Sequence, residues 1–372
     1  MKFSVSSSEL LKHVQVAAGA LGSNPVLPIL ENFLFGVSGK HLSICATDLE
    51  TTISTQLEVQ ADEDFSVAVP AKLLLDTLKA LPPQPITLSV NEENFSIEIT
   101  SSYGRYKVAG ERGTHFPEVP QPENVDSVKI NSKYLVEAIA KTAFATSNDE
   151  LRPAMTGVYF QVDFHKLTCV ATDAHRLVKF TTPHLVGEVA TSFIVPKKAL
   201  TLLKNTLPAD ATVEIAFNCA NAFFTFDSIH LVCRLIDARY PDYNAVIPVD
   251  NPNRLIVQRA DFQNSLKRIA IFANKTTNQV VLDIAHGNLT LSAQDLDFSN
   301  EATEQMPCTY EGIPLRIAFN AKFLVEMLGV LDTDEIKLEL STPSRAGVLT
   351  PVEEENTDRE ILMLVMPVML NA

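Results

Sequence analysis

The sequence lacks any apolar run long enough to cross a membrane, and it has few cysteines. Its longest apolar stretch, from Ile361 to Leu370, is far shorter than the roughly 20 residues that a spanning helix needs. The opening segment, Met1 to Ser6, has none of the apolar core of a secretory signal. The five cysteines among 372 residues include no Cys-x-x-Cys pair, which is typical of a reducing compartment. We therefore expect a soluble, cytoplasmic protein that makes no contact with a membrane.

The motifs of the common catalytic sites are also missing. The chain has no His-Glu-x-x-His, no glycine loop that could hold a phosphate and no nucleophile elbow. We accordingly expect no catalytic residue, no bound metal and no cofactor.

The chain does contain short sequence motifs that each recur three times. A helix opening recurs at 70–74, 196–200 and 320–324, and a strand ending recurs at 46–50, 171–175 and 293–297. The spacing is close to one third of the 372 residues, which indicates three copies of one domain. Proline-rich polar stretches separate the copies. We place the domains at 1–122, 127–248 and 249–372.

Within each copy the pattern predicts a helix, strands, a second helix and more strands. Apolar residues at helical spacing predict a helix after a serine cap over 7–22, and Pro70 opens a second helix over 71–81. The alternating segments 86–90 and 95–99 predict a hairpin. Equivalent helices are predicted near 132–147, 196–207, 259–275 and 320–331. The fold class is therefore α+β, and each domain is predicted to be a doubled βαβββ unit.

Charge is divided between these elements. The net charge of −15 argues against nucleic acid, but the six helix windows hold 13 of the 30 basic residues and only 5 of the 45 acidic ones. Lysine is a good helix former and could simply favour solvated faces. Glutamate is equally good, however, and is scarce in these helices. A basic helical surface beside acidic strands and loops is the alternative interpretation.

Helix packing distances limit what such a surface could surround. If six helices at about 10 Å spacing lined a ring, the opening would be about 9 Å, whereas twelve would leave about 28 Å. Duplex DNA is a rod of roughly 20 Å. One chain could not encircle a duplex, but two chains could.

Several short motifs occur in a specific order from Met1 to Leu370. They are Met1-Lys2-Phe3, Leu27-Pro28-Ile29-Leu30, Ala46-Thr47-Asp48-Leu49-Glu50, Val69-Pro70-Ala71-Lys72, Ala171-Thr172-Asp173-Ala174-His175-Arg176-Leu177, Val195-Pro196-Lys197-Lys198, Arg239-Tyr240-Pro241-Asp242-Tyr243 and Val365-Met366-Pro367-Val368. In this order the chain resembles the bacterial sliding clamp family, the beta subunit of DNA polymerase III. The resemblance implies clamp-type domains, with curved outer antiparallel sheets and two inner helices in each. It also implies a head-to-tail homodimeric ring on double-stranded DNA without sequence preference.

The same resemblance implies partners and sites. The replicative DNA polymerase subunit, the clamp loader and repair factors would bind through short hydrophobic peptide motifs. The implied peptide pocket is Met155, Thr172, Ala174, His175, Arg176, Leu177, Pro241, Val246, Leu364, Met366, Pro367, Val368 and Met369. The predicted DNA-facing residues are Lys12, Lys72, Lys79, Lys141, Arg152, Lys197, Lys198, Lys204, Lys267 and Arg268. The implied dimer interface is Tyr106 and Val108 against Ile271 and Phe272. At Asn24, Ala245 and Met369 the chain departs from basic residues found in some relatives.

Two other classes of function remain alternatives. A three-domain hydrolase or transferase could use the acid–base group around His175, and a repeat scaffold could bind proteins without DNA. Against catalysis, Asp48, Asp173 and Asp295 occupy equivalent positions in three repeats. We expect these aspartates to accept hydrogen bonds from the backbone at the end of a strand. His175 has no equivalent in the other repeats, which favours a pocket unique to the middle one.

Overall fold

The computed structural model describes residues 1–352 and 358–370. They form two compact units, of which unit 1 is Met1–Lys133 with Lys198–Leu235 and unit 2 is Tyr134–Lys197 with Ile236–Ala372. The division runs through the middle repeat. The second half of that repeat belongs with the first repeat, and its first half belongs with the third. No helix among the described residues has the length and apolar content needed to span a membrane.

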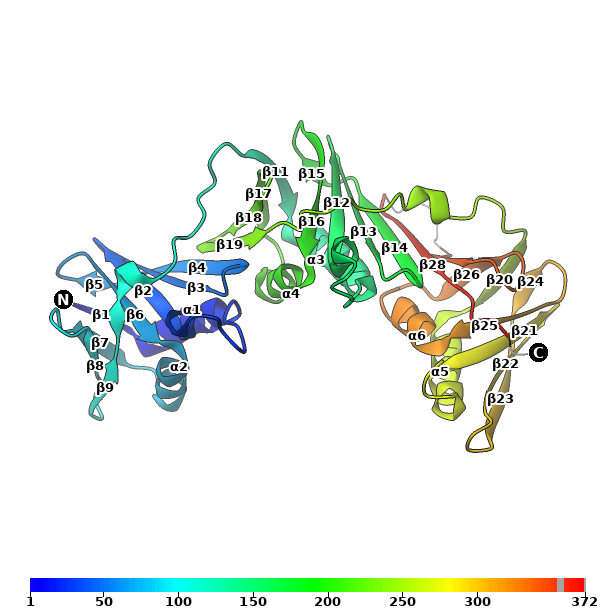
Figure 1. Ribbon diagram of the computed structural model, residues 1–372, viewed down its shortest axis with the longest axis horizontal. Helices are drawn as coiled ribbons and strands as arrows, with labels where there is room; N and C mark the ends of the chain where they lie inside the picture. Colours follow the sequence, from blue (N-terminus) through cyan, green and yellow to red (C-terminus); the bar gives the residue numbers. More distant parts are fainter. Residues whose placement is uncertain (353–357, 371–372) are drawn as a thin grey trace. The chain divides into compact units, whose positions relative to one another are not determined.

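Each repeat follows the same order of elements (Figure 1). The first contains β1 Lys2–Ser6, α1 Ser7–Ala18, β2 Asn32–Ser38, β3 His41–Thr47, β4 Thr51–Glu58, β5 Gln60–Ala61, β6 Phe65–Pro70, α2 Ala71–Ala80, β7 Pro85–Val90, β8 Ser96–Thr100, β9 Arg105–Ala109 and β10 Glu111–Arg112. The second contains β11 Asp126–Asn131, α3 Ser132–Thr142, β12 Gly157–Asp163, β13 Lys166–Thr172, β14 Arg176–Thr182, β15 Leu185–Val186, β16 Ala190–Pro196, α4 Lys197–Thr206, β17 Thr212–Phe217, β18 Asn221–Phe226 and β19 Ile229–Arg234. The third contains β20 Asn253–Gln258, α5 Arg259–Ile269, β21 Gln279–Ala285, β22 Asn288–Asp295, β23 Asn300–Pro307, β24 Thr309–Glu311, β25 Leu315–Asn320, α6 Ala321–Gly329, β26 Glu335–Leu340, β27 Gly347–Pro351 and β28 Glu360–Val365.

This order confirms the doubled βαβββ prediction and all six predicted helices. The helices end earlier than expected, because short 3₁₀ turns continue α3 over Ala143–Ala145 and α5 over Ala270–Phe272. The predicted serine cap is confirmed in position but not in its hydrogen bond. Ser6 is the N-cap of α1, but its side chain makes no capping hydrogen bond and its Oγ lies 2.9 Å from the Oγ of Ser8.

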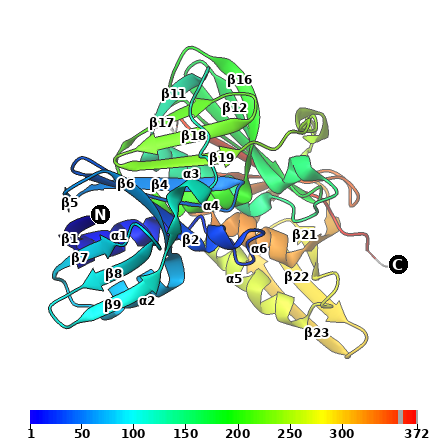
Figure 2. The same ribbon diagram turned by 60° about the vertical axis from the view of Figure 1, so that its left-hand side comes forward.

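Unit 1 is built from two antiparallel sheets with α1 and α2 packed side by side (Figures 1 and 2). One sheet has the order β5-β1-β7-β8-β9, and the other contains the run β10-β6-β2-β3-β4-β19-β18-β17-β11. Leu10, Val14 and Ala17 are the buried face of α1, at the spacing of an amphipathic helix. The pairing of β4 with β19 joins the first repeat to the second half of the middle repeat.

Unit 2 repeats this arrangement with other strands. Its sheets have the orders β16-β12-β13-β14-β28-β27-β26-β20-β24 and β23-β22-β21-β25, and α5 packs against α6. The pairing of β14 with β28 joins the first half of the middle repeat to the third repeat. β19 and β28 are each the last strand of their repeat. β4 and β14 are each the third strand after the first helix of their repeat. Both units therefore contain the same kind of junction between neighbouring repeats.

Candidate functional site

The equivalent aspartates Asp48, Asp173 and Asp295, which we call the strand-end aspartates, each bond the turn that follows a strand. Asp48 Oδ1 accepts the backbone N–H groups of Glu50 and Thr51, at 3.1 and 2.7 Å. Asp173 Oδ1 accepts those of His175 and Arg176, both at 3.0 Å. Asp295 Oδ1 accepts that of Asp297 at 3.2 Å. The prediction that these carboxylates bond backbone at a strand end is confirmed.

The residues after two of these aspartates have left-handed backbones. Leu49 has a φ of 80° and Ala174 a φ of 74°, a conformation that costs a non-glycine residue energy. The paired hydrogen bonds that each aspartate oxygen accepts from the backbone hold this turn in place. The three carboxylates thus have structural roles in their own turns, and among the described residues no cluster of three metal-binding side chains occurs.

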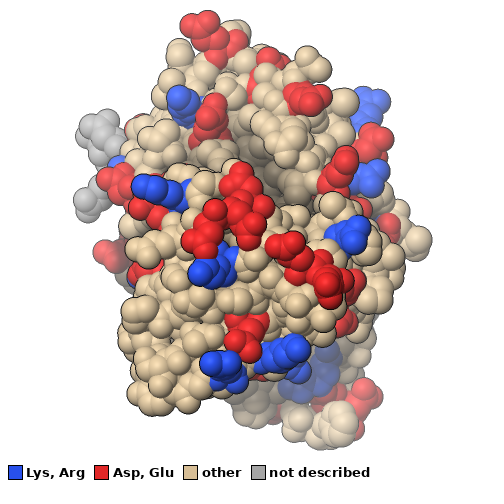
Figure 3. Space-filling view, turned by 90° about the vertical axis from the view of Figure 1, so that its left-hand side faces the viewer, with Lys and Arg blue, Asp and Glu red and all other residues tan. Residues whose placement is uncertain are grey.

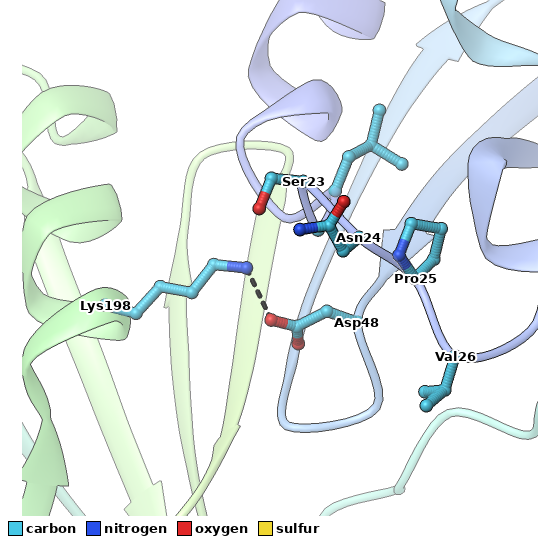
Figure 4. Close-up of a pocket in the computed structure, with 8 residues that line it drawn as sticks. Ser23, Asn24, Pro25, Val26, Asp48 and Lys198 are labelled. Atoms are coloured by element: carbon cyan, nitrogen blue, oxygen red, sulfur yellow. Dashed lines mark hydrogen bonds and ion pairs between the residues drawn. The ribbon is translucent and has the colours of Figure 1, made fainter.

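The second oxygen of Asp48 binds a cation from the next repeat (Figure 4). Lys198, at the start of α4, pairs with Asp48 Oδ2 and also donates to the backbone carbonyl of Ala20 at 3.2 Å. The pair lines a hollow of about 540 Å³, whose opposite wall is the loop from Leu21 to Val26. Lys198 therefore holds the end of α1 and the end of β3 against α4.

The second oxygen of Asp173 binds Arg176, whose side chain is only 7% exposed. Its Nε donates to Asp173 at 3.1 Å, and its two remaining nitrogens donate to Glu326 and to the carbonyl of Phe144. The guanidinium lies 5.1 Å from the ring centroid of Phe144 and 4.7 Å from that of Phe323. The Arg176 side chain is thus occupied by protein partners from η3, at residues 143–145, and from α6.

Two of the predicted peptide-pocket residues, Leu177 and Leu364, belong to one apolar cluster in unit 2. Leu177 and Leu364 are 2% and 3% exposed and pack with Tyr240, Tyr243 and neighbouring apolar residues. Three further predicted members, Val246, Met366 and Met369, are 57%, 41% and 75% exposed. Buried leucines together with exposed methionines and a valine are the residue types that suit a site for a short apolar peptide.

Several of the remaining predicted pocket residues make hydrogen bonds that involve the backbone. The carbonyl of His175 accepts the backbone N–H of Met366 at 2.8 Å, and Val368 donates to the Ala318 carbonyl at the same distance. Thr172 is buried, and its hydroxyl donates to the carbonyl of Arg176 at 2.7 Å. Of the other four members, Met155 and Pro367 are half-buried, and Ala174 and Pro241 are exposed.

A hollow of about 570 Å³ lies beside Arg176. Its lining includes Arg152, Lys197 and His175 together with Phe323 and Glu326. His175 is exposed and its ring lies 6.1 Å from that of Phe323, at 20° between the planes. The hollow therefore brings together residues assigned from the sequence to two different sites, the DNA-facing set and the peptide pocket.

Nine of the ten predicted DNA-facing residues fall into two groups, and the tenth, Lys197, lines the hollow beside Arg176. Lys12, Lys141, Arg152, Lys198 and Arg268 form ion pairs with neighbouring carboxylates. Lys141 is the most confined, because its side chain is 15% exposed, pairs with Glu137 and lies over the ring of Phe180. Lys72, Lys79, Lys204 and Lys267 are exposed and form no ion pair within the described part of the chain. On the face shown in Figure 3, basic and acidic side chains lie close together.

The predicted interface residues lie near two open sheet edges. β9 is the last strand of one sheet in unit 1, and β23 is the last strand of one sheet in unit 2. On β9 Tyr106 is half-buried, but Val108 is 5% exposed and points into its own core, so Val108 can offer only its backbone. Ile271 and Phe272 are 64% and 40% exposed.

The two edges carry opposite charges, which the sequence analysis did not notice. Arg105 and Lys107 are the exposed cations of β9, and β23 carries Glu301 and Glu304. Arg268 and Ser265 bond Glu304, and the hydrogen bond from Arg268 holds the pKa of Glu304 below its ordinary value. Two acidic residues on one predicted strand and two basic residues on another were the available signal.

Three other residues were missed, namely Phe144, Phe323 and Glu326, which surround Arg176. Phe323 and Glu326 are three positions apart on α6 and so share a face, but nothing in the sequence connects that face with Arg176. The buried cysteines offer no reactive thiol, because burial raises the pKa of Cys45 and of Cys233 to about 12.

Comparison with known proteins gives one consistent result. Family models of the DNA polymerase III beta subunit match three consecutive segments. The N-terminal domain model matches residues 1–120, the central domain model 129–242 and the C-terminal domain model 244–367.

Individual relatives agree with these matches. The chain is 30% identical to a beta sliding clamp of Synechococcus elongatus over 384 residues, covering all of both chains. It is 30% identical to one of Pseudomonas putida, covering 98% of this chain and 100% of the other. Among solved structures, the DNA polymerase III subunit beta of Pseudomonas aeruginosa is 27% identical and superposes with a TM-score of 0.94 over the full length of both chains.

Proposed function

The chain belongs to the family of DNA polymerase III beta subunits, the beta sliding clamps, and we propose that it acts as a head-to-tail homodimeric ring around duplex DNA. This family consists of non-catalytic processivity subunits, so a hydrolase or transferase centred on His175 is not the function. The three family models also support clamp domains at 1–122, 127–248 and 249–372. A clamp works on the chromosome, and we infer a cytoplasmic location.

The pattern of strand pairing is the main observation that supports a ring. β4 pairs with β19, and β14 pairs with β28. In the third repeat the strand equivalent to β4 and β14 is β23, and in the first repeat the strand equivalent to β19 and β28 is β9. Both β23 and β9 are edge strands of their sheets. A third junction of the same kind therefore needs β23 of one copy and β9 of another. Their opposite charges favour that pairing and disfavour the pairing of like edges.

The DNA-facing role is best supported for the exposed lysines. Lys79, Lys204 and Lys267 each lie on a helix and have no competing carboxylate within ion-pair distance among the described residues. Contacts from such side chains to phosphate carry no sequence information and weaken with salt. They suit a protein that slides, because no base is read.

The peptide-binding role is supported by the apolar cluster under Leu177 and Leu364. Substituting Met366 by glutamate should abolish binding of a short apolar peptide, because a carboxylate would then face the apolar floor. Val249 is 99% exposed and is not among the predicted pocket residues, so Val249→Glu is the matched control. Equal binding by both variants would remove Met366 from the pocket.

Sedimentation equilibrium tests the ring most simply. The wild-type chain should have twice its monomer mass of 40.9 kDa. Charging Ile271 and Phe272 together to glutamate should leave a folded monomer, since both are exposed in the single chain. Leu151→Glu, at a side chain that is 91% exposed, is the control for surface charge. A wild-type monomer at every concentration would defeat the proposal.

A further inference from the structure

The first junction contains an ion pair as well as paired strands. Asp48 directly follows β3 of the first repeat, and Lys198 is the second residue of α4, the second helix of the next repeat. Both belong to unit 1. The lysine Nζ binds the one carboxylate oxygen that the turn after β3 leaves free (Figure 4). The strand-end aspartate of one repeat is thus neutralised by the helix of the following repeat.

The internal repeat identifies the equivalent lysines. Lys72 is the second residue of α2 and Lys322 is the second residue of α6, so both correspond to Lys198 on α4. At the second junction the lysine is not needed, because Arg176 of β14 already donates to Asp173 and reaches α6 through Glu326. Two of the three strand-end aspartates therefore have a cation within their own chain.

The third aspartate has none among the described residues. Asp295 is 4% exposed, and within the described part of the chain its side chain accepts one hydrogen bond, from the backbone N–H of Asp297. The residue three positions further on, where Asp173 finds Arg176, is Phe298. A buried carboxylate that lacks a cation is costly. The neighbouring side chains of Leu296 and Phe298 are 76% and 74% exposed, which marks an uncovered apolar surface.

We propose that Lys72 of a second copy of this chain pairs with Asp295 and neutralises it at the junction between subunits. The repeat that follows the third in a head-to-tail ring is the first repeat of the next copy, and its lysine at this position is Lys72. Lys72 is exposed and has no ion pair within the described residues. The pair rests on the proposed ring, and it assigns Lys72 to the interface instead of to DNA.

A double-variant cycle on the dimer dissociation constant tests the pair. Lys72→Ala and Asp295→Asn should each raise the constant about tenfold, and the double variant should raise it no further than the larger single change. Lys79→Ala, on an exposed lysine of the same helix, should leave the constant unchanged. Multiplicative effects in the double variant, or no effect of either single change, would overturn the pairing.

Two further measurements keep the result interpretable. Lys72→Glu changes an exposed side chain and cannot unfold the core, so it should weaken the dimer even if Asp295→Asn proves unstable by circular dichroism. The wild-type protein separates the two proposals. If it never dimerises, the ring has failed, whereas a stable dimer without coupling between Lys72 and Asp295 leaves the ring and rejects the pair.

Discussion

Replacing Arg176 by methionine should destabilise unit 2 by about 3 kcal/mol, because the guanidinium joins β14 to α6 and η3. Loss of the cation leaves Asp173, 15% exposed, without its charged partner, which costs about 1–3 kcal/mol. Glu326 is 51% exposed, so its ion pair contributes only about 0–1 kcal/mol. The two ring contacts add roughly 0.5–1 kcal/mol each. Methionine retains most of the side-chain volume, so a cavity contributes little.

Urea unfolding followed by tyrosine fluorescence measures this effect. The chain has seven tyrosines and no tryptophan, and Tyr134, Tyr159, Tyr240, Tyr243 and Tyr310 lie in unit 2, so the signal reports mainly on that unit. Arg176→Lys is the informative control, because it keeps the charge but loses the planar fork and should recover less than half of the loss. A methionine variant within 1 kcal/mol of wild type would refute the reasoning.

Three further predictions concern titration and DNA. Burial lowers the pKa of His13 in the folded protein. The contribution of His13 to the free energy of unfolding should therefore be complete above pH about 6.5, where the ring is neutral in both states. It should be lost as the pH falls through the folded pKa. His13→Gln should flatten this dependence of the free energy of unfolding, and an unchanged slope would exclude His13. Burial alone would raise the pKa of Glu137, but hydrogen bonds from Lys141 and Arg359 outweigh it and the pKa is lowered. Glu137→Gln should therefore destabilise the protein at pH 7 and have no effect once the pH is well below the folded pKa, and an equal cost at both would contradict the ion pairs. Lys204→Ala should reduce the slope of log affinity for DNA against log salt by about 1, while Lys141→Ala should leave it unchanged, and equal slopes would reject the division into exposed and paired lysines.

The repeated elements were predictable from sequence because their signals are local. The spacing of Leu10, Val14 and Ala17 predicts α1 without knowledge of any distant residue. The role of the strand-end aspartates followed from their recurrence in three repeats, since a feature present three times belongs to the fold and not to one site.

The contacts that connect repeats were not predictable in the same way. Lys198 and Asp48 are separated by 150 positions, as are Arg176 and Glu326, and no local pattern indicates either pair. Charge alone therefore assigned Lys198 to DNA. Similarly, the charge of Lys141 alone predicts a free surface cation, but in the folded protein its side chain is half-buried and pairs with Glu137.

The central claim, that two copies of this chain enclose DNA, is tested most directly by the topology of release. The protein should be placed by a clamp loader on nicked circular DNA, freed of the loader and followed as a restriction enzyme cuts the circle. The account predicts long retention on the circle and rapid loss once free ends exist, because the contacts to phosphate are weak and the attachment is topological. Equal rates of loss from circular and linear DNA at the same salt concentration would contradict it.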